Sequence, residues 1–355
     1  MKWISDTKID HLRALASQPD LSATKYTIVK ELARGGMGTV YLAEDTELAR
    51  QVAIKVLNPE VVDEDDRQRM LREAQVIARL EHPGIVPVHD VGRLDDGRIY
   101  YAMKYVRGRR LDEYVAQGDS INDRLRKFQA VCDAVAFAHS NGVVHRDLKP
   151  QNIMIGAFGE VLVLDWGVAK LIVRGADAGT GRRGYEDARV LSPHLPISPS
   201  PGSPISPSLS ADGTIIGTLG YMAPEQARGE TQSVDERSDV YSLGVILYFL
   251  LTKEPPKPRA DYADLRRPRE FDSKITKQAE AVCARAMARD RNERYERALD
   301  LSADIGRLLD GEPVSAYREG VVDKLGRWLG KNRFLVLLVL TYLLMRIILL
   351  FTSGR

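Results

Sequence analysis

The chain has 355 residues, enough for one large domain with additional segments. Charged residues make up 28% and hydrophobic residues 44%, with a formal net charge of +2, so the composition is globular and gives no electrostatic sign of nucleic-acid binding. The two cysteines, Cys132 and Cys283, lie in apolar helical patterns, which argues against a disulfide framework or a cysteine-based metal site. We therefore expect a reducing compartment and no nucleic-acid partner.

Residues 1–25 form an N-terminal extension in which charges recur every few positions, so it is not a secretory signal. Residues 26–106 contain short β-branched or aromatic runs, namely YTIVKEL, TVYLAED, QVAIKVL and RIYYAMKYV. Between the third and fourth runs, DRQRMLREAQVIARLEH has helical spacing of its apolar residues. This region is predicted to be a small antiparallel sheet with one helix against it.

From residue 107 the pattern becomes mainly helical. The stretch RLRKFQAVCDAVAFAHSNG ends in a glycine-containing stop signal, and SDVYSLGVILYFLLT is apolar almost all round, as in a helix at the centre of a lobe. The fold class is therefore predicted to be α+β, with a sheet-rich lobe over 26–106 and a larger helical lobe over 107–309.

Inside the second lobe, residues 191–210 read LSPHLPISPSPGSPISPSLS. Proline at this density prevents helix formation, so an extended insertion is predicted over about residues 175–212. Two interpretations stay open, a solvated spacer or a regulatory tract, because five serines each precede a proline: Ser192, Ser198, Ser200, Ser203 and Ser206.

Residues 334–351 read FLVLLVLTYLLMRIILLF and would span about 27 Å as a helix, close to the hydrocarbon thickness of a bilayer. We predict a single transmembrane helix here, with Arg346 near enough to the end to reach the headgroups. The alternatives are a buried C-terminal helix or a chain truncated from something longer. Basic residues in the linker 310–333 place the large N-terminal part in the cytoplasm, on the cell membrane: Arg327, Lys331 and Arg333.

A glycine-rich turn between two predicted strands, ELARGGMGTVYLAED, would let backbone N–H groups approach nucleotide phosphates. It is followed by VAIK, where Lys55 could reach the same phosphates, and by Glu73, which could pair with Lys55. Taken alone, Lys55 could equally be a solvated surface lysine.

Further on come VVHRDLKPQN at 143–152, DWG at 165–167 and APE at 223–225. The order of these motifs resembles the eukaryotic-type protein kinase family, specifically its bacterial Ser/Thr branch, over roughly residues 26 to 309. The resemblance implies a two-lobed protein kinase fold, ATP and Mg²⁺ as cofactors, and transfer of the γ-phosphoryl group to proteins. This reaction needs positioning and charge compensation, which the residues of these motifs can supply.

The resemblance also implies roles for individual residues. Asp147 would accept the substrate proton, Lys149 would neutralise the transferring phosphoryl group, and Asn152 with Asp165 would hold Mg²⁺. Lys55 and Glu73 would orient the phosphates, and His145 would pack beneath the loop. The nucleotide would lie between the lobes, against the segment Met103, Lys104, Tyr105 and Val106, and against the remaining predicted contacts: Leu32, Ala33, Gly35, Gly36, Gly38, Val40, Ala53 and Met154.

Lys149 and Thr218 match the pattern of kinases that act on Ser and Thr hydroxyls. Thr214 occupies the position of an activating phosphothreonine, which Arg146 could bind after autophosphorylation, possible in trans between two copies. Glu225 and Arg294 match the family's buried ion pair, and Asp239 the residue that holds the catalytic loop.

Three features depart from the family pattern. Ala33 replaces the first glycine of the glycine-rich loop, and Trp166 replaces the usual phenylalanine, where we expect it to pack near Ile77, Val88 and His145. The segment from Asp165 to Glu225 is also longer than usual, because of the Ser/Pro-rich insertion.

A pseudokinase scaffold is the non-enzymatic alternative, although every polar group that catalysis needs is present in the sequence. A small-molecule kinase has less support, since the APE region belongs with peptide substrates. A dinucleotide-binding domain is excluded because GGMG lacks the required glycine spacing and joins two strands instead of a strand and a helix.

Overall fold

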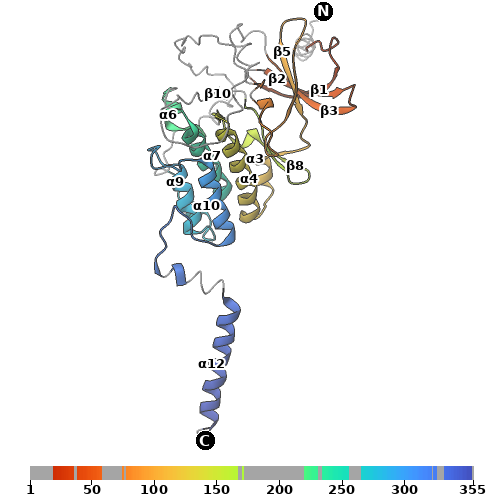
Figure 1. Cartoon of the computed structure of the whole chain (residues 1–355). Coiled ribbons are helices and arrows are strands. Elements are labelled where there is room, and N and C mark those ends of the chain that lie inside the picture. The colour runs from red at the N-terminus through yellow and green to blue at the C-terminus, as the bar shows by residue number, and fades with distance from the viewer. Residues whose placement is uncertain are drawn as a thin grey trace, which may run out of the picture.

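A computed structural model describes residues 19–35, 38–57, 74–75, 77–166, 170–171, 220–230, 234–255, 265–321, 323–325 and 332–353. These residues form a sheet-rich lobe near the N-terminus and a helical lobe below it, with one helix extending away at the C-terminal end (Figure 1). The predicted two-lobed α+β fold is confirmed.

The N-lobe is built on a five-stranded antiparallel sheet in the order β1-β2-β3-β5-β4. Its strands are β1 (Tyr26–Gly35), β2 (Gly38–Asp45), β3 (Arg50–Leu57), β4 (Val88–Arg93) and β5 (Ile99–Lys104). Successive side chains of β3 alternate between two buried clusters, one containing Val52 and Ile54 and the other containing Ala53 and Leu57. The second cluster also holds Ala74, where the described part of the predicted N-lobe helix begins.

Helices make up most of the C-lobe: α3 (Leu111–Ala116), α4 (Ile121–Ser140), α6 (Pro224–Ala227), α7 (Glu236–Thr252), α8 (Pro268–Phe271), α9 (Lys277–Ala286) and α10 (Ala298–Asp310). The Ser120 hydroxyl caps α4 by accepting from the Asp123 amide at 3.1 Å, and the Asp235 carboxylate caps α7 by accepting from the Arg237 amide at 2.9 Å. Lys253 ends α7 in the left-handed conformation.

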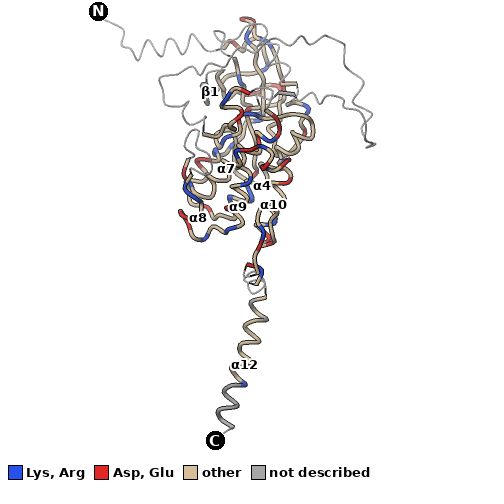
Figure 2. Tube along the Cα trace, turned by 90° about the vertical axis from the view of Figure 1, so that its left-hand side faces the viewer, with Lys and Arg blue, Asp and Glu red and all other residues tan. Residues whose placement is uncertain are grey.

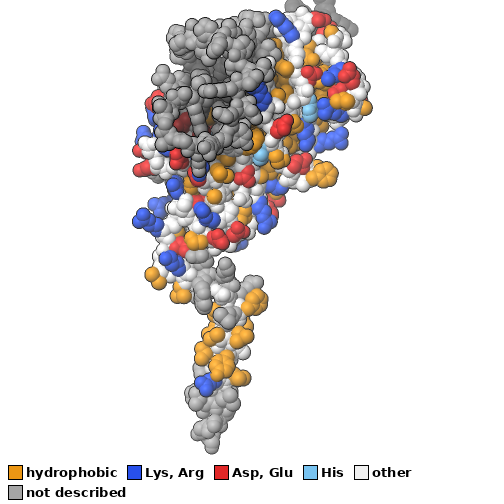
Figure 3. Space-filling model, viewed as in Figure 1, with side chains coloured by type: hydrophobic (Ala, Val, Ile, Leu, Met, Phe, Trp, Pro, Cys, Tyr) orange, Lys and Arg blue, Asp and Glu red, His pale blue; other side chains and the backbone are white. Residues whose placement is uncertain are grey.

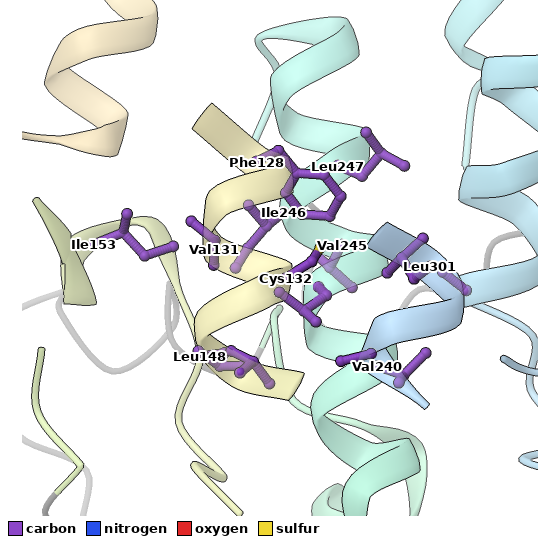
Figure 4. Close-up of a cluster of buried hydrophobic side chains, with 14 of the residues drawn as sticks. Phe128, Val131, Cys132, Leu148, Ile153, Val240, Val245, Ile246, Leu247 and Leu301 are labelled. Atoms are coloured by element: carbon purple, nitrogen blue, oxygen red, sulfur yellow. The ribbon is translucent and has the colours of Figure 1, made fainter. Parts of the chain in front are cut away.

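The C-lobe core forms around α7, which is buried on all sides as its sequence predicts. Phe128, Val131 and Cys132 of α4 pack against Val245 and Ile246 of α7 in the cluster drawn in Figure 4. Each of these side chains is fully buried, and removal of a ring such as that of Phe128 would cost about 3–5 kcal/mol.

Short strands place the loops between the lobes. β6 (Gly108–Arg110), β8 (Ile153–Gly156) and β9 (Val161–Val163) form one small sheet, and β7 (Val143–Val144) pairs with β10 (Lys170–Leu171). The turn η1 (Pro150–Asn152) lies directly before β8, so the segment between β7 and η1 is held at both ends.

Contacts with the C-lobe continue beyond α10. The buried Asp304 carboxylate accepts hydrogen bonds from the amide and hydroxyl of Ser315 at 2.8 and 2.7 Å and from the amide of Ala316 at 3.2 Å. It also accepts from the Tyr295 hydroxyl at 2.8 Å, and Val314 is buried in the lobe's core. The first residues of the predicted linker are therefore packed against the lobe.

The last described element is α12 (Arg333–Ser353), which lies apart from both lobes in the two views (Figures 1 and 2). Apolar side chains cover much of its upper part in Figure 3, and those of Phe334, Leu337 and Leu338 are exposed. Within the described parts of the chain, no helix has the length and apolarity needed to cross a membrane.

Candidate active site

The loop between β7 and η1 is fixed by a carboxylate from the centre of the C-lobe. Asp239, in the first turn of α7, is fully buried and accepts from the backbone amides of His145 at 2.7 Å and Arg146 at 2.8 Å. His139 of α4 contacts the same carboxylate through Nε2 at 2.8 Å. Burial alone would raise the pKa of Asp239, but the hydrogen bonds from His139 and from the His145 amide hold it below its ordinary value.

Two residues around this loop adopt the left-handed conformation, Arg146 with φ 69° and Asp165 with φ 55°. Such a backbone costs of the order of 1–3 kcal/mol for a residue other than glycine, so the surroundings must hold it in place. At Arg146 they do so on both sides, because Asp239 accepts from its amide and Gln226 Nε2 donates to its carbonyl oxygen at 2.9 Å. The loop geometry is therefore determined by α6 and α7.

Asp147, Lys149 and Asn152, which were predicted to act together, lie together in the structure. Lys149 Nζ forms an ion pair with Asp147 Oδ2 at 2.8 Å. Asn152 Nδ2 donates to the Asp147 carbonyl oxygen at 2.8 Å and to its carboxylate at 3.2 Å. These contacts fix the orientation of the carboxylate while leaving the side chain partly accessible.

Lys55 of the N-lobe reaches this cluster by forming an ion pair with Asp165. Its position on β3 is set by the register, in which it pairs with Val40 of β2 and Tyr101 of β5. Burial alone would lower the pKa of Lys55, but Tyr101 and Asp165 outweigh burial and raise it, so the amine stays protonated. Burial alone would raise the pKa of Asp165, but the charge of Lys55 and its hydrogen bond outweigh burial, so this pKa is lowered.

Glu73, the predicted partner of Lys55, lies outside the described residues, as do Gly36, Thr214 and Thr218. The predicted contact between Lys55 and Glu73 therefore stays a prediction. So does the predicted role of Thr214 as an acceptor of phosphate.

The donors predicted for Mg²⁺ are adjacent. The Leu164 amide donates to the Asn152 carbonyl oxygen at 2.7 Å, which brings Asn152 beside Asp165. Because the Asn152 side chain donates both hydrogen bonds to Asp147 through Nδ2, its amide oxygen is the candidate ligand, and Asp165 supplies a carboxylate. Across the described part of the chain no group of three His, Cys, Asp or Glu side chains could hold a metal. Two oxygen donors fit Mg²⁺, which usually keeps water molecules and takes further ligands from substrate phosphates.

The predicted adenine contacts converge on the strands and the connection between the lobes. Ala53 and Met103 are cross-strand partners and both are buried, as is Val106, while Met154 of β8 is partly buried. The remaining described members lie on β1 and β2 or at the end of β5: Leu32, Ala33, Gly35, Gly38, Val40 and Lys104.

Glycine is required at Gly38 by a close backbone approach. A Cβ there would lie 2.4 Å from the carbonyl oxygen of Val56, a distance that real Cβ atoms do not show. At Ala33 a side chain is tolerated in extended strand, where it pairs with Val40. The β1–β2 pairing thus continues through Ala33, after a register shift between Glu31 and Ala33.

Trp166 is buried next to His145, as predicted, with ring centroids 4.7 Å apart and a tilt of 51°. It belongs to the same cluster as Ile77, and Val88 packs against that cluster. Its indole Nε1 donates to the Val163 carbonyl oxygen at 3.2 Å, a hydrogen bond that phenylalanine could not make. His145 contacts the Leu164 carbonyl oxygen through Nε2 at 2.9 Å, which agrees with a structural role.

Glu225 and Arg294 form the predicted buried ion pair, with two N–H···O contacts of 2.8 and 3.0 Å. Ser238 Oγ donates to the same carboxylate at 2.7 Å, and the guanidinium lies over the Tyr241 ring at 4.9 Å. Burial alone would raise the pKa of Glu225, but the contacts with Arg294 outweigh burial and lower this pKa. The pair ties α6 to the segment after α9.

The structure adds Gln226 to the site, which the sequence analysis did not identify. Besides its bond to Arg146, Gln226 Oε1 accepts from the Ala223 amide at 3.1 Å, so it links the APE segment to the catalytic loop. In the sequence, the position of Gln226 directly after the APE motif was the feature that could have indicated this role.

Comparisons with known proteins agree with this geometry. Residues 26–304 match the family model described as protein kinase domain. Serine/threonine-protein kinase PknD of Protochlamydia amoebophila is 34% identical over 312 residues, covering 81% of this chain and 30% of that protein. Serine/threonine-protein kinase PknB of Mycobacterium tuberculosis is 36% identical over 313 residues, covering 84% of this chain and 45% of that protein.

The chain thus spans less than half the length of these two relatives. Among solved structures, the crystal structure of the Mycobacterium tuberculosis PknI kinase domain is similar, with a TM-score of 0.57 and 26% identity, covering 80% of this chain and 96% of that one. The chain belongs to the protein kinase family, with bacterial eukaryotic-type Ser/Thr kinases as its relatives.

Proposed function

We propose that the chain is a Ser/Thr protein kinase that transfers the γ-phosphoryl group of Mg-ATP to hydroxyl groups of proteins. The observation that carries the proposal is the ion pair between Lys55 and Asp165, which brings the N-lobe lysine to the edge of the catalytic loop. The cluster of Asp147, Lys149 and Asn152 beside it supplies the groups that phosphoryl transfer needs.

Each residue has a role that its contacts support. Asp147, held by Lys149 and Asn152, would orient the substrate hydroxyl and accept its proton. Lys149 would offset charge on the transferring group, and Lys55 would bind the nucleotide phosphates. Asn152 and Asp165 would hold Mg²⁺, and bound Mg-ATP would supply the phosphoryl group and the metal's countercharge.

The test is phosphoryl transfer by the full chain from labelled ATP with Mg²⁺ to a generic basic protein. Asp147→Asn should reduce incorporation by at least about a hundredfold, since general base catalysis contributes roughly 10²–10⁴. Asp300→Asn is the matched control, because this α10 carboxylate is partly exposed and, among the residues that the structure describes, forms its ion pair with Arg297. Equal incorporation by the Asp147 variant and the unchanged chain would refute the proposal.

A pseudokinase that binds nucleotide without transfer is distinguished by the same experiment. Such a protein would bind ATP with Mg²⁺ but incorporate no label in either chain. The presence of Lys55, Asp147, Lys149, Asn152 and Asp165 in one cluster favours the enzyme.

We also propose autophosphorylation of Thr214 in trans, supported by its spacing before Thr218 and by the presence of Arg146 directly before Asp147. Mixing the active chain with the Asp147→Asn chain and locating phosphate by mass spectrometry tests this. Phosphate at Thr214 of the inactive chain is the expected result. Its absence while the active chain phosphorylates other proteins would contradict it.

Finally, we propose that residues 334–351 attach the chain to a membrane with the kinase lobes in the cytoplasm. The apolar run in the sequence and the basic residues before it support this. The full chain should sediment with liposomes, and a chain ending at residue 331 should not. Absence of lipid binding by the full chain would contradict the proposal.

A further inference from the structure

A cavity of about 480 Å³ lies in the C-lobe, within the range of roughly 300–1,000 Å³ typical of small-molecule sites. Four helices line it, through the start of α4, the end of α7, the start of α9 and the end of α10. The catalytic loop follows the opposite end of α4, and a helix of 20 residues is about 30 Å long. The cavity is therefore separate from the active site.

Arg124 lines this cavity and is only 5% exposed. Its Nη1 donates to the Leu250 carbonyl oxygen, one of the last carbonyls of α7, which lack partners within the helix. Nε is buried without a hydrogen bond, and none of the ion pairs among the described residues includes Arg124. Capping α7 thus uses one of five donors. Asp119 and Asp272 act on Arg124 electrostatically but neither forms an ion pair with it, whereas a buried guanidinium is usually paired with an anion.

Two helix N-termini meet at the same cavity. Ser120, Ile121 and Asn122 line it from the start of α4, and Thr276 lines it from the start of α9. The Ser120 and Thr276 side chains cap the amides of Asp123 and Ala279, both at 3.1 Å. The amides that precede these capped positions have no intrahelical partner and carry partial positive charge. With Arg124 and the nearby Lys274, they favour an anion.

The rest of the lining limits what that anion can be. Asp119 and Asp272 also line the cavity, and Asp272 accepts from the Lys274 amide at 2.8 Å. Burial lowers the pKa of Arg124, and these two carboxylates partly offset that effect, so the guanidinium stays charged. These two carboxylates would repel a doubly charged group such as phosphate more strongly than a singly charged one. Apolar side chains complete the wall: Leu125, Leu251, Ile275, Ala279 and Leu308.

We propose that this cavity binds a small monocarboxylate with a short apolar chain. The carboxylate accepts from Arg124 and from the start of α4, and the chain packs against Leu251 and Leu308. This site goes beyond the proposed kinase function, since ligand binding here requires neither ATP nor a protein substrate.

The test is isothermal titration of the full chain with hexanoate, with Arg124→Gln as the variant and Arg126→Gln as its matched control. Glutamine keeps a polar amide at position 124 but removes the charge, and Arg126 lies on the same helix but is 69% exposed and does not line the cavity. Hexanoate should bind saturably to the unchanged chain and to the Arg126 variant, and at least tenfold more weakly to the Arg124 variant. Equal affinity for all three chains, or no saturable binding, would overturn the proposal.

Three further measurements keep the result specific. Hexan-1-ol and phosphate should each bind at least tenfold more weakly than hexanoate, because one lacks the charge and the other lacks the chain. Equal binding of hexanol would point to the apolar surface of α12 and overturn the proposal.

Leu308→Trp, which fills the cavity from α10, should abolish hexanoate binding while Arg124 is unchanged. Unchanged binding of hexanoate by this variant would also overturn the proposal. Kinase activity in the same samples tests the proposed function independently.

Discussion

Lys55 forms an ion pair with Asp165 across the two lobes, although 110 positions separate these residues in the chain. The pair joins β3 to the segment that follows β9. Lys55→Met keeps much of the side-chain volume but removes the charge, so it should lower the affinity for Mg-ATP and reduce phosphoryl transfer by at least about a hundredfold. Kinetic assays with titrated ATP would show this, and an unchanged turnover would contradict it.

The Glu225–Arg294 pair should make stability depend on acid pH. In the folded state the pKa of Glu225 is lowered below the unfolded value of about 4.3. Between these two pKa values the unfolded state binds more protons, so stability rises with pH. The contribution is present above the unfolded pKa and is lost as pH falls through the folded pKa. Glu225→Gln should flatten the acid side of the stability profile and cost about 3–5 kcal/mol at neutral pH. Urea unfolding at several pH values measures both, and an unchanged acid slope would contradict the prediction.

Trp166→Phe should remove the indole hydrogen bond to Val163 while leaving a ring against His145. We expect a loss of stability of about 1–3 kcal/mol, from the hydrogen bond and the space left by the smaller ring. Denaturant unfolding of the variant measures this. A variant as stable as the unchanged chain would show that the indole N–H contributes nothing.

Gly38→Ala should disrupt the β2–β3 pairing, because its Cβ would meet the Val56 carbonyl oxygen at 2.4 Å. Gly320→Ala is the matched control, since the nearest described atom to its Cβ would be Asp323 Oδ2, at an ordinary contact distance of 3.7 Å. The first substitution should lower both the melting temperature and the ATP affinity, and the second neither. Equal melting temperatures for the two variants would contradict this.

Asp304→Asn should destabilise the C-lobe, because the charged carboxylate accepts hydrogen bonds from Tyr295, Ser315 and Ala316. The neutral amide that replaces it is a weaker acceptor and has only one oxygen. Hydrogen bonds to charged groups contribute about 1.5–3 kcal/mol each, so a loss of several kcal/mol is expected. A chain ending at residue 309 should be destabilised similarly relative to one ending at residue 331. Equal unfolding midpoints for these two chains would refute the role of Ser315.

Much of the site could be predicted from the sequence because its residues occur in short motifs. Asp147, Lys149 and Asn152 lie within six positions, and their mutual contacts follow from that proximity. Only the resemblance placed Lys55 and Asp165 around the same nucleotide, since nothing local links β3 to the segment after β9.

Other contacts could not be predicted, because they depend on how distant helices pack. The sequence shows no sign that Asp304 would bind Ser315, or that Arg124 would reach Leu250 126 positions away. The predicted lobe boundary at residue 309 marks the end of the helical pattern of α10, whereas Val314 still belongs to the core. Periodicity locates helices but does not reveal the irregular segments that pack against them.

Both ends of α7 are fastened to other parts of the C-lobe, through Asp239 at its start and the Leu250 carbonyl at its end. A helix that is buried on every side and held in this way has no route for local fraying. Its amide hydrogens should exchange with solvent only when the entire lobe unfolds, so their exchange rate reports the global free energy of the domain. Any ligand that stabilises the lobe, wherever it binds, would be detected as slower deuterium uptake in α7.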